Sequence, residues 1–366
     1  MYVTRLAYKS YRNLIDGSIS PSEGINIICG GNAQGKTNLL EAVWLFTGGH
    51  SFRGTKDSEI PRLNPETGRN AEGCSLALDF YSRDRDQKAQ LNIDRGRRST
   101  VINGVEKKSG TALIGKICAV IFSPEHLQLI KGGPGGRRNF VDAAICQLRP
   151  GYAKTLSSYH RSVLQRNTLL KDITRHPALL DTLEVWDMRL AKYGGILMEE
   201  RERYIKRISP EIANVYAGIS KNSEKITFSY KPSVDSGEQS LLDCLTESRN
   251  ADIRMGYSSR GPHRDDLNIE IDGISARLFA SQGQQRSAVL AMKLAEAQIL
   301  GEETGEAPII LLDDVLSELD SSRQNYLLNN LSGRQVFITC CTPVLSNGRL
   351  FDVEKGTVRD KRAIEN

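Results

Sequence analysis

The chain has 366 residues, with 49 Lys and Arg against 44 Asp and Glu, which gives a formal net charge of +5. Charged residues make up 25% and hydrophobic residues 39%, values typical of a soluble globular protein. This composition excludes a disordered chain, a collagen and a disulfide-stapled mini-protein, and at ~100–200 residues per domain the length allows about two or three domains.

The first third of the chain is predicted to be rich in β-strands. A strand over 25–28 leads into a glycine-rich loop at 30–35, and a helix is expected over 38–46. Short strands are expected again over 75–106. Within them, the run Ile102-Asn103-Gly104-Val105 is typical of a β-hairpin.

The middle of the chain is predicted to be mainly helical. After an apolar strand at 117–122, a helical pattern runs from Arg138 to about Val215. Five apolar residues within it recur at intervals of three and four, as on one face of a helix. They are Leu183, Trp186, Leu190, Tyr193 and Leu197. The opposite face carries Asp187, Arg189 and Lys192, and we expect it to be polar.

The last part of the chain alternates strands and helices. The expected elements are a strand over 226–230, a polar stretch with one amphipathic turn over 233–249, a helix over 284–300, a strand over 308–312, a helix over 321–331 and a strand over 336–339. Strand, helix and strand in this order predict a parallel α/β core. We therefore expect an α/β head domain assembled from 1–125 and 252–366, with a mainly helical domain inserted at 126–251.

The lack of a recognisable targeting signal and the spacing of the cysteines predict a cytoplasmic protein. Residues 1–6 interleave charged, polar and apolar side chains, so they lack the apolar centre of a secretory signal. The longest apolar runs are far shorter than the ~18 residues that a membrane helix needs. The cysteines stand at 29, 74, 118, 146, 244, 340 and 341. Their odd number and spacing suit reduced, buried thiols better than disulfides or a metal site.

The most specific motif is a phosphate-binding loop. It fits G-x-x-x-x-G-K-[ST] and comprises Gly30, Gly31, Asn32, Ala33, Gln34, Gly35, Lys36 and Thr37, with Asn38 next. A strand precedes the loop and a helix follows it, as the motif requires. Lys36 is expected to contact the β- and γ-phosphates, and Thr37 to offer a hydroxyl to Mg²⁺. The alternative interpretation is a glycine-rich turn without a ligand.

A second acidic motif follows an apolar strand. Residues 309–312 are expected to hold the strand in the sheet, so that Asp313 emerges at its carboxyl end beside the phosphate loop. Asp313 is then placed to organise Mg²⁺ and its waters. Asp314 is placed to polarise the attacking water as a general base.

The third motif indicates a dimer. Ser281, Gly283 and Gln284 stand at the start of a predicted helix, where a hydroxyl, a flexible residue and the helix dipole can meet an anion. Because the chain already has one phosphate loop, a second such element makes sense if it serves the nucleotide of another copy. An ordinary capped helix is the alternative. Residues 317–320, after the acidic strand, stand where such a dimer would place a loop between its two copies. Thr339, at the end of the next apolar strand, stands where a switch residue at the γ-phosphate is expected.

Together these motifs resemble the ABC-type ATPases of the SMC class. Residues that further resemble the RecF family within that class lie at 11–13, 124–142 and 261–266. The resemblance covers nearly the whole chain and implies a P-loop head that binds ATP and Mg²⁺, forms an ATP-dependent homodimer and hydrolyses ATP slowly. It also implies binding to double-stranded and gapped DNA without sequence specificity. Implied partners are RecR together with RecO, and indirectly RecA.

The resemblance also assigns weaker roles to single residues. It places Arg12 near the base or phosphates and Arg53 near the γ-phosphate. Two positions depart from related ATPases, because Asp314 stands where many have Glu and Thr339 stands where transporters have His. The shorter carboxylate predicts slow hydrolysis.

Basic clusters are the candidate DNA contacts. They comprise Arg95, Arg97, Arg98, Lys107 and Lys108 around the predicted hairpin, and Arg137 and Arg138 after a glycine-rich loop. Such cations would bind backbone phosphates without reading sequence, although most charge clusters are simply solvated surface.

Two other functions stay open at this point. One is the nucleotide-binding subunit of a transporter, and the other is a P-loop kinase or a non-hydrolysing interaction protein.

Overall fold

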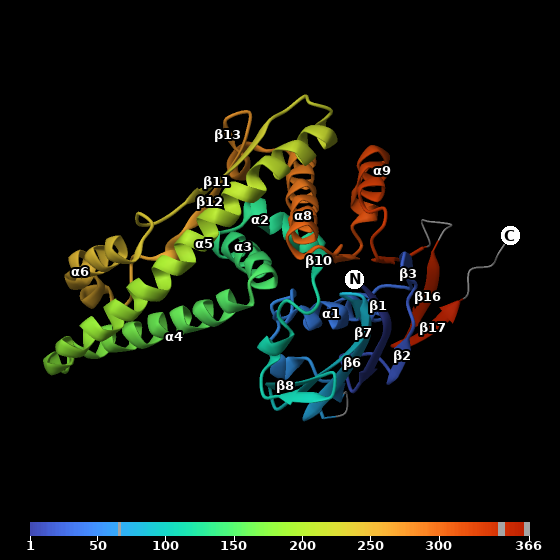
Figure 1. Ribbon diagram of the computed structural model, residues 1–366, viewed down its shortest axis with the longest axis horizontal. Helices are drawn as coiled ribbons and strands as arrows, with labels where there is room; N and C mark the ends of the chain where they lie inside the picture. The colour runs from blue at the N-terminus through green and yellow to red at the C-terminus, as the bar shows by residue number, and fades with distance from the viewer. Residues whose placement is uncertain (65–66, 343–347, 362–366) are drawn as a thin grey trace. The chain divides into compact units, whose positions relative to one another are not determined.

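The structure is a computed structural model that describes residues 1–64, 67–342 and 348–361 (Figure 1). The chain divides into two compact units. The first unit, the head, comprises Met1–His126 and Leu290–Asn366, and the second comprises Leu127–Val289. None of the helices formed by the described residues combines the length and apolarity needed to cross a bilayer.

The head contains a mainly parallel sheet with strand order β10-β14-β15-β3-β16-β17. Its strands are β3 (Ile25–Cys29), β10 (Ala119–Phe122), β14 (Ile309–Leu312), β15 (Val336–Cys340), β16 (Arg349–Glu354) and β17 (Thr357–Lys361). Only β17 runs antiparallel to its neighbour among these described strands. The strands from both ends of the chain therefore lie side by side, as the α/β prediction requires.

Helices connect the parallel strands, so the carboxyl ends of the strands meet at one edge. They are α1 (Lys36–Trp44) after β3, the end of α8 (Gln282–Thr304) before β14, and α9 (Ser321–Asn330) between β14 and β15. Short 3₁₀ turns cover Leu45–Thr47, Asp57–Glu59, Gly110–Leu113, Pro124–Leu127 and Leu316–Glu318.

A second sheet of the head is antiparallel, with strand order β2-β1-β6-β7-β8-β9. Its strands are β1 (Tyr2–Lys9), β2 (Gly17–Ile19), β6 (Gly73–Ser82), β7 (Arg85–Asp94), β8 (Arg97–Ile102) and β9 (Val105–Lys107), and a two-residue pair joins β4 (Leu63–Asn64) to β5 (Arg69–Asn70). The predicted hairpin is confirmed, because Ile102 pairs with Val105. Buried residues of both sheets and of α1 form one apolar core.

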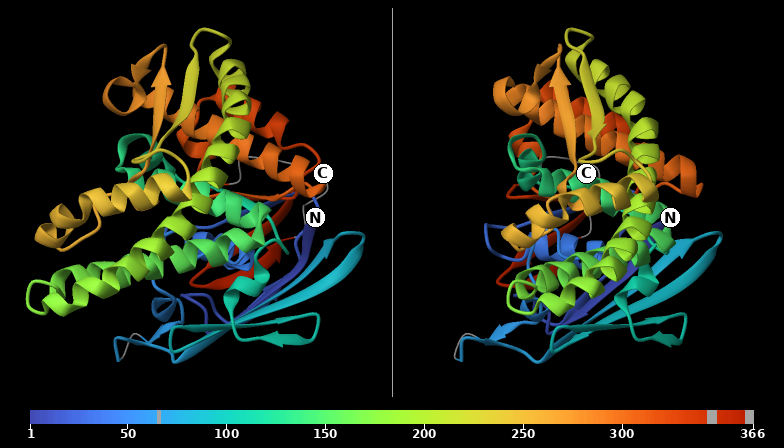
Figure 2. Two further views of the ribbon diagram at one scale, coloured as in Figure 1. Left: turned by 60° about the vertical axis from the view of Figure 1, so that its left-hand side comes forward. Right: turned by 90° about the vertical axis from the view of Figure 1, so that its left-hand side faces the viewer.

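The second unit combines helices with a small antiparallel sheet (Figure 2). The helices are α2 (Gln128–Lys131), α3 (Pro134–Leu148), α4 (Pro150–Asp172), α5 (Leu180–Ser220), α6 (Glu238–Met255), α7 (Ala276–Phe279) and the start of α8. The strands are β11 (Ile226–Lys231), β12 (Asp266–Ile271) and β13 (Ile274–Ser275), with short 3₁₀ turns at Pro177–Leu179 and Pro262–Arg264. Both views in Figure 2 show α4 and α5 lying side by side.

The structure corrects one predicted boundary of the insert. The prediction ended the insert at residue 251, whereas the second unit continues to Val289. The reason is strand pairing across the sequence, because all six residues of β12 pair with β11 in register. The polar stretch predicted at 233–249 is also more regular than expected, since most of it belongs to the 18-residue helix α6.

The apolar face predicted for α5 is confirmed, but its opposite face is not uniformly polar surface. Leu183, Leu190 and Leu197 are buried, and so is Asp187. The Asp187 carboxylate accepts hydrogen bonds from Arg166 Nε at 2.6 Å and from Arg249 at 2.9 Å. Arg166 also donates to Asp252 Oδ2 at 2.6 Å. A buried charge needs such partners, so Asp187 belongs to an ionic network that joins α4, α5 and α6.

A second buried network organises the sequence at 261–266. Arg201 of α5 donates to both oxygens of Asp142, at 2.8 Å each, and to the carbonyl oxygen of Pro262 at 2.7 Å. His263 Nδ1 lies 2.7 Å from the hydroxyl of Tyr159. Burial lowers the pKa of His263 to about 4, so the ring is neutral near pH 7. These contacts give the motif a structural role within the second unit.

Candidate nucleotide site

The phosphate loop joins β3 to α1, and two of its glycines are required by the backbone. Gly30 has φ 155° and Gly35 has φ 118°, conformations that side chains rarely adopt. A Cβ atom on Gly30 would lie 2.3 Å from the carbonyl oxygen of Val353. A Cβ atom on Gly35 would lie 2.7 Å from Leu14 Cδ2 and 2.8 Å from Asn13 Oδ1. The loop therefore has the tight backbone that the sequence motif predicts.

Lys36 folds back over the loop. Its Nζ donates to the carbonyl oxygens of Gly30 at 2.8 Å and Gly31 at 3.1 Å, and the residue is only 4% exposed. The ammonium group is thus held above the loop backbone, at the start of α1. Backbone N–H groups at a helix N-terminus together with a fixed cation form a site suited to a phosphate group.

The two motifs expected to bind Mg²⁺ meet directly. Thr37 Oγ1 donates to Asp313 Oδ1 at 2.8 Å, across 276 positions of sequence. Burial raises the pKa of Asp313, and the hydroxyls of Thr37 and Thr339 oppose that shift. Among the described residues, no group of three or more His, Cys, Asp or Glu could hold a metal by itself. Mg²⁺ usually keeps waters and phosphate oxygens, so one carboxylate and one hydroxyl fit its protein ligands.

Thr339 serves the acidic motif from the neighbouring strand. Its hydroxyl donates to Asp313 Oδ1 at 2.9 Å and accepts the backbone N–H of Asp314 at 2.8 Å. Asp314 has φ 50°, in the left-handed region that aspartate adopts more readily than most residues other than glycine. Thr339 is 1% exposed, so in this structure its side chain supports the Asp313 carboxylate and the Asp314 backbone and does not reach the opening of the loop. Cys341 lies there instead, with its Sγ 3.7 Å from Lys36 Nζ.

Replacing Thr339 with valine is expected to lower the free energy of unfolding by about 1–3 kcal/mol, because the partly buried N–H of Asp314 would lose its acceptor. Valine keeps the shape and the strand preference of threonine, so a packing defect contributes little. Urea denaturation measures the loss, and Thr339→Ser, which keeps the hydroxyl, should recover most of it. Equal stability of the valine and wild-type proteins would show that the hydroxyl contributes nothing.

Arg12 is held away from the phosphate loop. Its Nε and Nη2 donate to the two oxygens of Glu41, each at 2.8 Å. Tyr11 and Ser51 also donate to this buried carboxylate. Burial alone would raise the pKa of Glu41, but these donors outweigh it and hold the pKa below its usual value. In this structure Arg12 ties the turn after β1 to α1.

Arg53 reaches the loop through two asparagines. Its Nη1 donates to Asn38 Oδ1 at 3.0 Å, Asn38 Nδ2 donates to Asn13 Oδ1 at 2.6 Å, and Asn13 Nδ2 donates to the carbonyl oxygen of Ala33 at 3.0 Å. Asn13 was not predicted as a site residue, although it stands in the motif at 11–13. Gln34 was assigned only to the loop, yet its carbonyl oxygen accepts the N–H of Gly356 at 3.2 Å.

The predicted dimer signature lies at the start of α8 and belongs to the second unit. Ser281 Oγ accepts the N–H of Gln284 at 3.2 Å, and Gln284 Oε1 accepts the N–H of Ser281 at 2.8 Å. This reciprocal arrangement is a capping box. Ser281 is exposed, and the preceding Leu278 and Phe279 are each 72% exposed. The hydrogen bonds at the start of α8 are therefore those of an ordinary helix cap. The turn before it exposes apolar side chains to solvent.

The structure removes some of the predicted DNA contacts. Arg98 is largely buried and donates to both oxygens of Asp57, and Arg137 does the same with Asp266. Arg138 donates to the carbonyl oxygen of Asp265, and burial lowers its pKa. Arg98 and Arg137 are structural cations, because a buried guanidinium is stable only with such partners.

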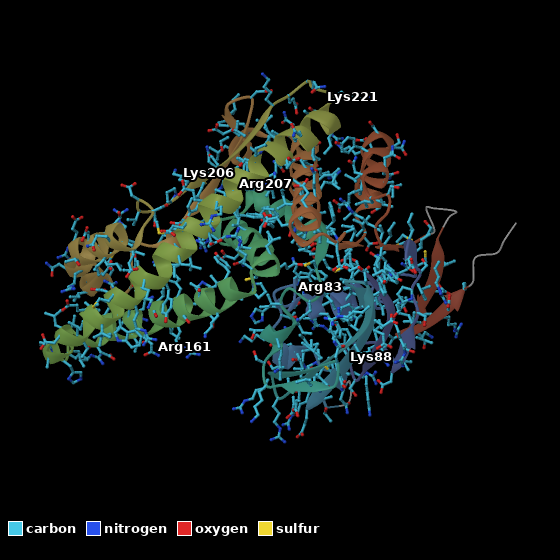
Figure 3. The ribbon with its side chains drawn as sticks, in the orientation of Figure 1. Arg83, Lys88, Arg161, Lys206, Arg207 and Lys221 are labelled. Carbon is cyan, nitrogen blue, oxygen red and sulfur yellow. The ribbon has the colours of Figure 1, made fainter. Side chains whose placement is uncertain are left out.

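Other cations remain exposed. Arg97, Lys107 and Lys108 are exposed in the head. Arg83, in the turn before β7, and Lys88, on β7, are exposed as well (Figure 3). Further exposed cations of the second unit are labelled in Figure 3, namely Arg161 on α4 and Lys206, Arg207 and Lys221 on or just after α5.

Comparison with known proteins decides the family. The RecF/RecN/SMC N terminal domain family matches residues 2–356. A DNA replication and repair protein RecF from Acetivibrio thermocellus is 40% identical over 360 residues, covering 96% of this chain and 96% of that protein. This chain belongs to the RecF family. A RecF relative from Agathobacter rectalis is 38% identical over 341 residues, covering 93% and 92% of the two chains.

Solved structures agree with the RecF assignment. A structure of the recombination mediator protein RecF with ATP, in the RecFOR pathway, has a TM-score of 0.91 and 36% identity, and the match covers 98% of this chain and 97% of that one. A Smc head domain from Pyrococcus furiosus has a TM-score of 0.55 and 16% identity, which shows a shared fold alone. The expected ABC-type, SMC-like head fold is therefore confirmed. These relatives give no support to the transporter or kinase alternatives.

Proposed function

We propose that this RecF-family chain is a DNA-binding ATPase of replication and repair, in which ATP controls the association of two copies on DNA. The observation that carries the proposal is the 2.8 Å hydrogen bond between Thr37 and Asp313, because it unites the phosphate loop and the acidic strand in one site. RecF relatives are named for DNA replication and repair, and one was solved with ATP.

The loop residues 30–37 and Asn38 would bind the triphosphate, with Lys36 supplying the cation at the β- and γ-phosphates. Thr37 and Asp313 would hold Mg²⁺, which neutralises phosphate charge when bound. Asp314 would accept a proton from the attacking water. The proximity of Asp314 to both motifs through Thr339 supports this division of roles.

The exposed turn at Ser281 supports a dimer in which each copy completes the other's nucleotide site. Ser281, Gly283 and Gln284 would approach the triphosphate bound by a second copy. The exposed side chains of Leu278 and Phe279 beside this turn would then lose water contact, which favours association. Thr339 and Arg53 would act near the γ-phosphate, and Arg12 near the base or the phosphates, only after rearrangement from the contacts described above.

Replacing Ser281 with arginine is expected to weaken ATP-dependent dimer formation by about tenfold or more, because a bulky cation would stand where the turn must approach a nucleotide. Analytical ultracentrifugation with ATP and Mg²⁺ measures the change. Ser157→Arg, at an exposed position of α4, is the matched control for the added charge. An unaltered dimer in the Ser281 variant would reject this turn as a dimer contact.

The function as a whole is tested by sizing the protein alone, with ATP and Mg²⁺, and then with gapped double-stranded DNA. We expect a dimer with nucleotide and a larger complex with DNA. A permanent monomer that still hydrolyses ATP would contradict the proposal. RecR with RecO would be the protein partners and would act on RecA indirectly, which a pull-down with purified RecR can test.

A further inference from the structure

Three of the seven cysteines gather at the carboxyl ends of two parallel strands. Cys29 ends β3 and Cys340 ends β15, and the two residues are paired in register. Their sulfur atoms are 2.9 Å apart and both residues are buried. Cys341 follows directly and is exposed. Cys341 is the first residue beyond β15 and lies outside the buried pair.

Cys341 lies against the groups that face the phosphates. Its Sγ is 3.3 Å from Asn32 Oδ1 and 3.7 Å from Lys36 Nζ. Lys36 Nζ is the atom expected to contact the β- and γ-phosphates. Any group attached to this sulfur would therefore begin within one contact distance of the bound triphosphate.

Accessibility distinguishes Cys341 from the other thiols. All seven cysteines lie in the described part of the chain, and of these only Cys341 is exposed. Burial raises the pKa of Cys340 to about 12 and that of Cys118 to about 11. Thiols react as thiolates and need access to reagent, so these buried groups are poor nucleophiles.

We propose that Cys341 is a thiol-modification site and that the group attached to its sulfur and a bound nucleoside triphosphate exclude each other. The modifying group is a low-molecular-weight thiol, delivered by its disulfide. The Cys341 thiolate attacks one sulfur of the disulfide, the old S–S bond breaks, and the second thiol leaves as a thiolate. The Cys341 sulfur is oxidised and the small disulfide is reduced. A reducing thiol reverses the exchange.

The inference rests on the proposed nucleotide site, and it adds a means of closing that site. The adduct would fill the space above Lys36 without altering Lys36, Thr37 or Asp313. Asn32 and Lys36 would lose their access to phosphate while the fold of the loop stays intact. Binding of ATP should in turn shield the Cys341 sulfur from reagent.

The test treats the full chain with oxidised glutathione and measures ATP binding by equilibrium dialysis before treatment, after treatment and after reduction. We expect affinity for ATP to fall by at least about tenfold and to return on reduction. Each variant is compared with its own untreated sample. The fall should be absent in Cys341→Ser and present in Cys244→Ser, which removes a half-buried thiol of the second unit.

Mass spectrometry of the modified sites supplies an independent readout. ATP with Mg²⁺ should slow modification of Cys341 by at least about tenfold and leave the rate at Cys244 unchanged. If the untreated chain binds ATP but the adduct leaves affinity intact, or if ATP gives no protection, the inference is wrong and the proposed function stands. If the untreated chain binds no ATP, the proposed function itself fails, and the inference with it.

Discussion

Lys36→Met is expected to reduce ATP affinity by at least about 100-fold, because it removes the cation fixed above the phosphate loop. Charge-assisted hydrogen bonds contribute about 1.5–3 kcal/mol each, and the ammonium group can make more than one to a triphosphate. Methionine matches the length and apolar stem of lysine. The variant loses the two hydrogen bonds from Nζ to the carbonyl oxygens of Gly30 and Gly31, but the strand and helix on either side of the loop stay in place, so the loop should keep its fold.

Equilibrium dialysis with ATP and Mg²⁺ measures the effect of the Lys36 substitution. Lys355→Met is the matched control, because Lys355 also lies beside the loop and contacts Gln34 only through its backbone N–H. Its exposed side chain should be replaceable with little loss of affinity. Comparable losses in the two variants would show that general positive charge, and not a fixed phosphate contact, accounts for ATP binding.

The core of the head could be predicted from sequence because its signals are local. The strand before the phosphate loop, the loop itself and the helix after it are contiguous, so pattern and spacing specify them together. The acidic strand is likewise a short apolar run that ends in two carboxylates. Their meeting at one sheet edge follows from parallel strand order, which the alternation of strands and helices already predicts.

Charged residues were harder to predict because their environment depends on partners far away in sequence. Asp187 has the spacing of a surface residue, but Arg166 and Asp252 bring it into a buried network. Arg98 stands in a basic cluster, but Asp57 neutralises it. No local pattern distinguishes a solvated cation from one that a distant carboxylate holds inside the fold.

The end of β15 shows a limit of a different kind. The sequence indicates a strand followed by a switch residue, but not the residue at which the strand leaves the sheet. β15 continues to Cys340, so Thr339 stays buried beside Asp313 and Cys341 reaches the phosphate loop. β15 is one residue longer than predicted, and Cys341, the first residue beyond it, is the one that contacts Lys36.

Asp314→Asn is expected to lower ATP hydrolysis by about 10²–10⁴-fold while leaving ATP binding nearly unchanged. The amide cannot accept a proton from the attacking water. Binding should persist because Thr37 bonds to Asp313 and not to Asp314. Asparagine also tolerates the φ of 50° at this position, so the backbone N–H can still donate to Thr339.

A variant that binds ATP but does not hydrolyse it should remain dimeric on DNA for as long as ATP is present. Single-turnover hydrolysis and ultracentrifugation with ATP, Mg²⁺ and gapped DNA measure the two properties separately. Asp313→Asn is the control for loss of Mg²⁺ binding, because a weakened metal ligand should reduce Mg²⁺-dependent ATP binding as well as turnover. Wild-type turnover by the Asp314 variant would reject Asp314 as the group that activates water, since no proton acceptor would remain on that side chain.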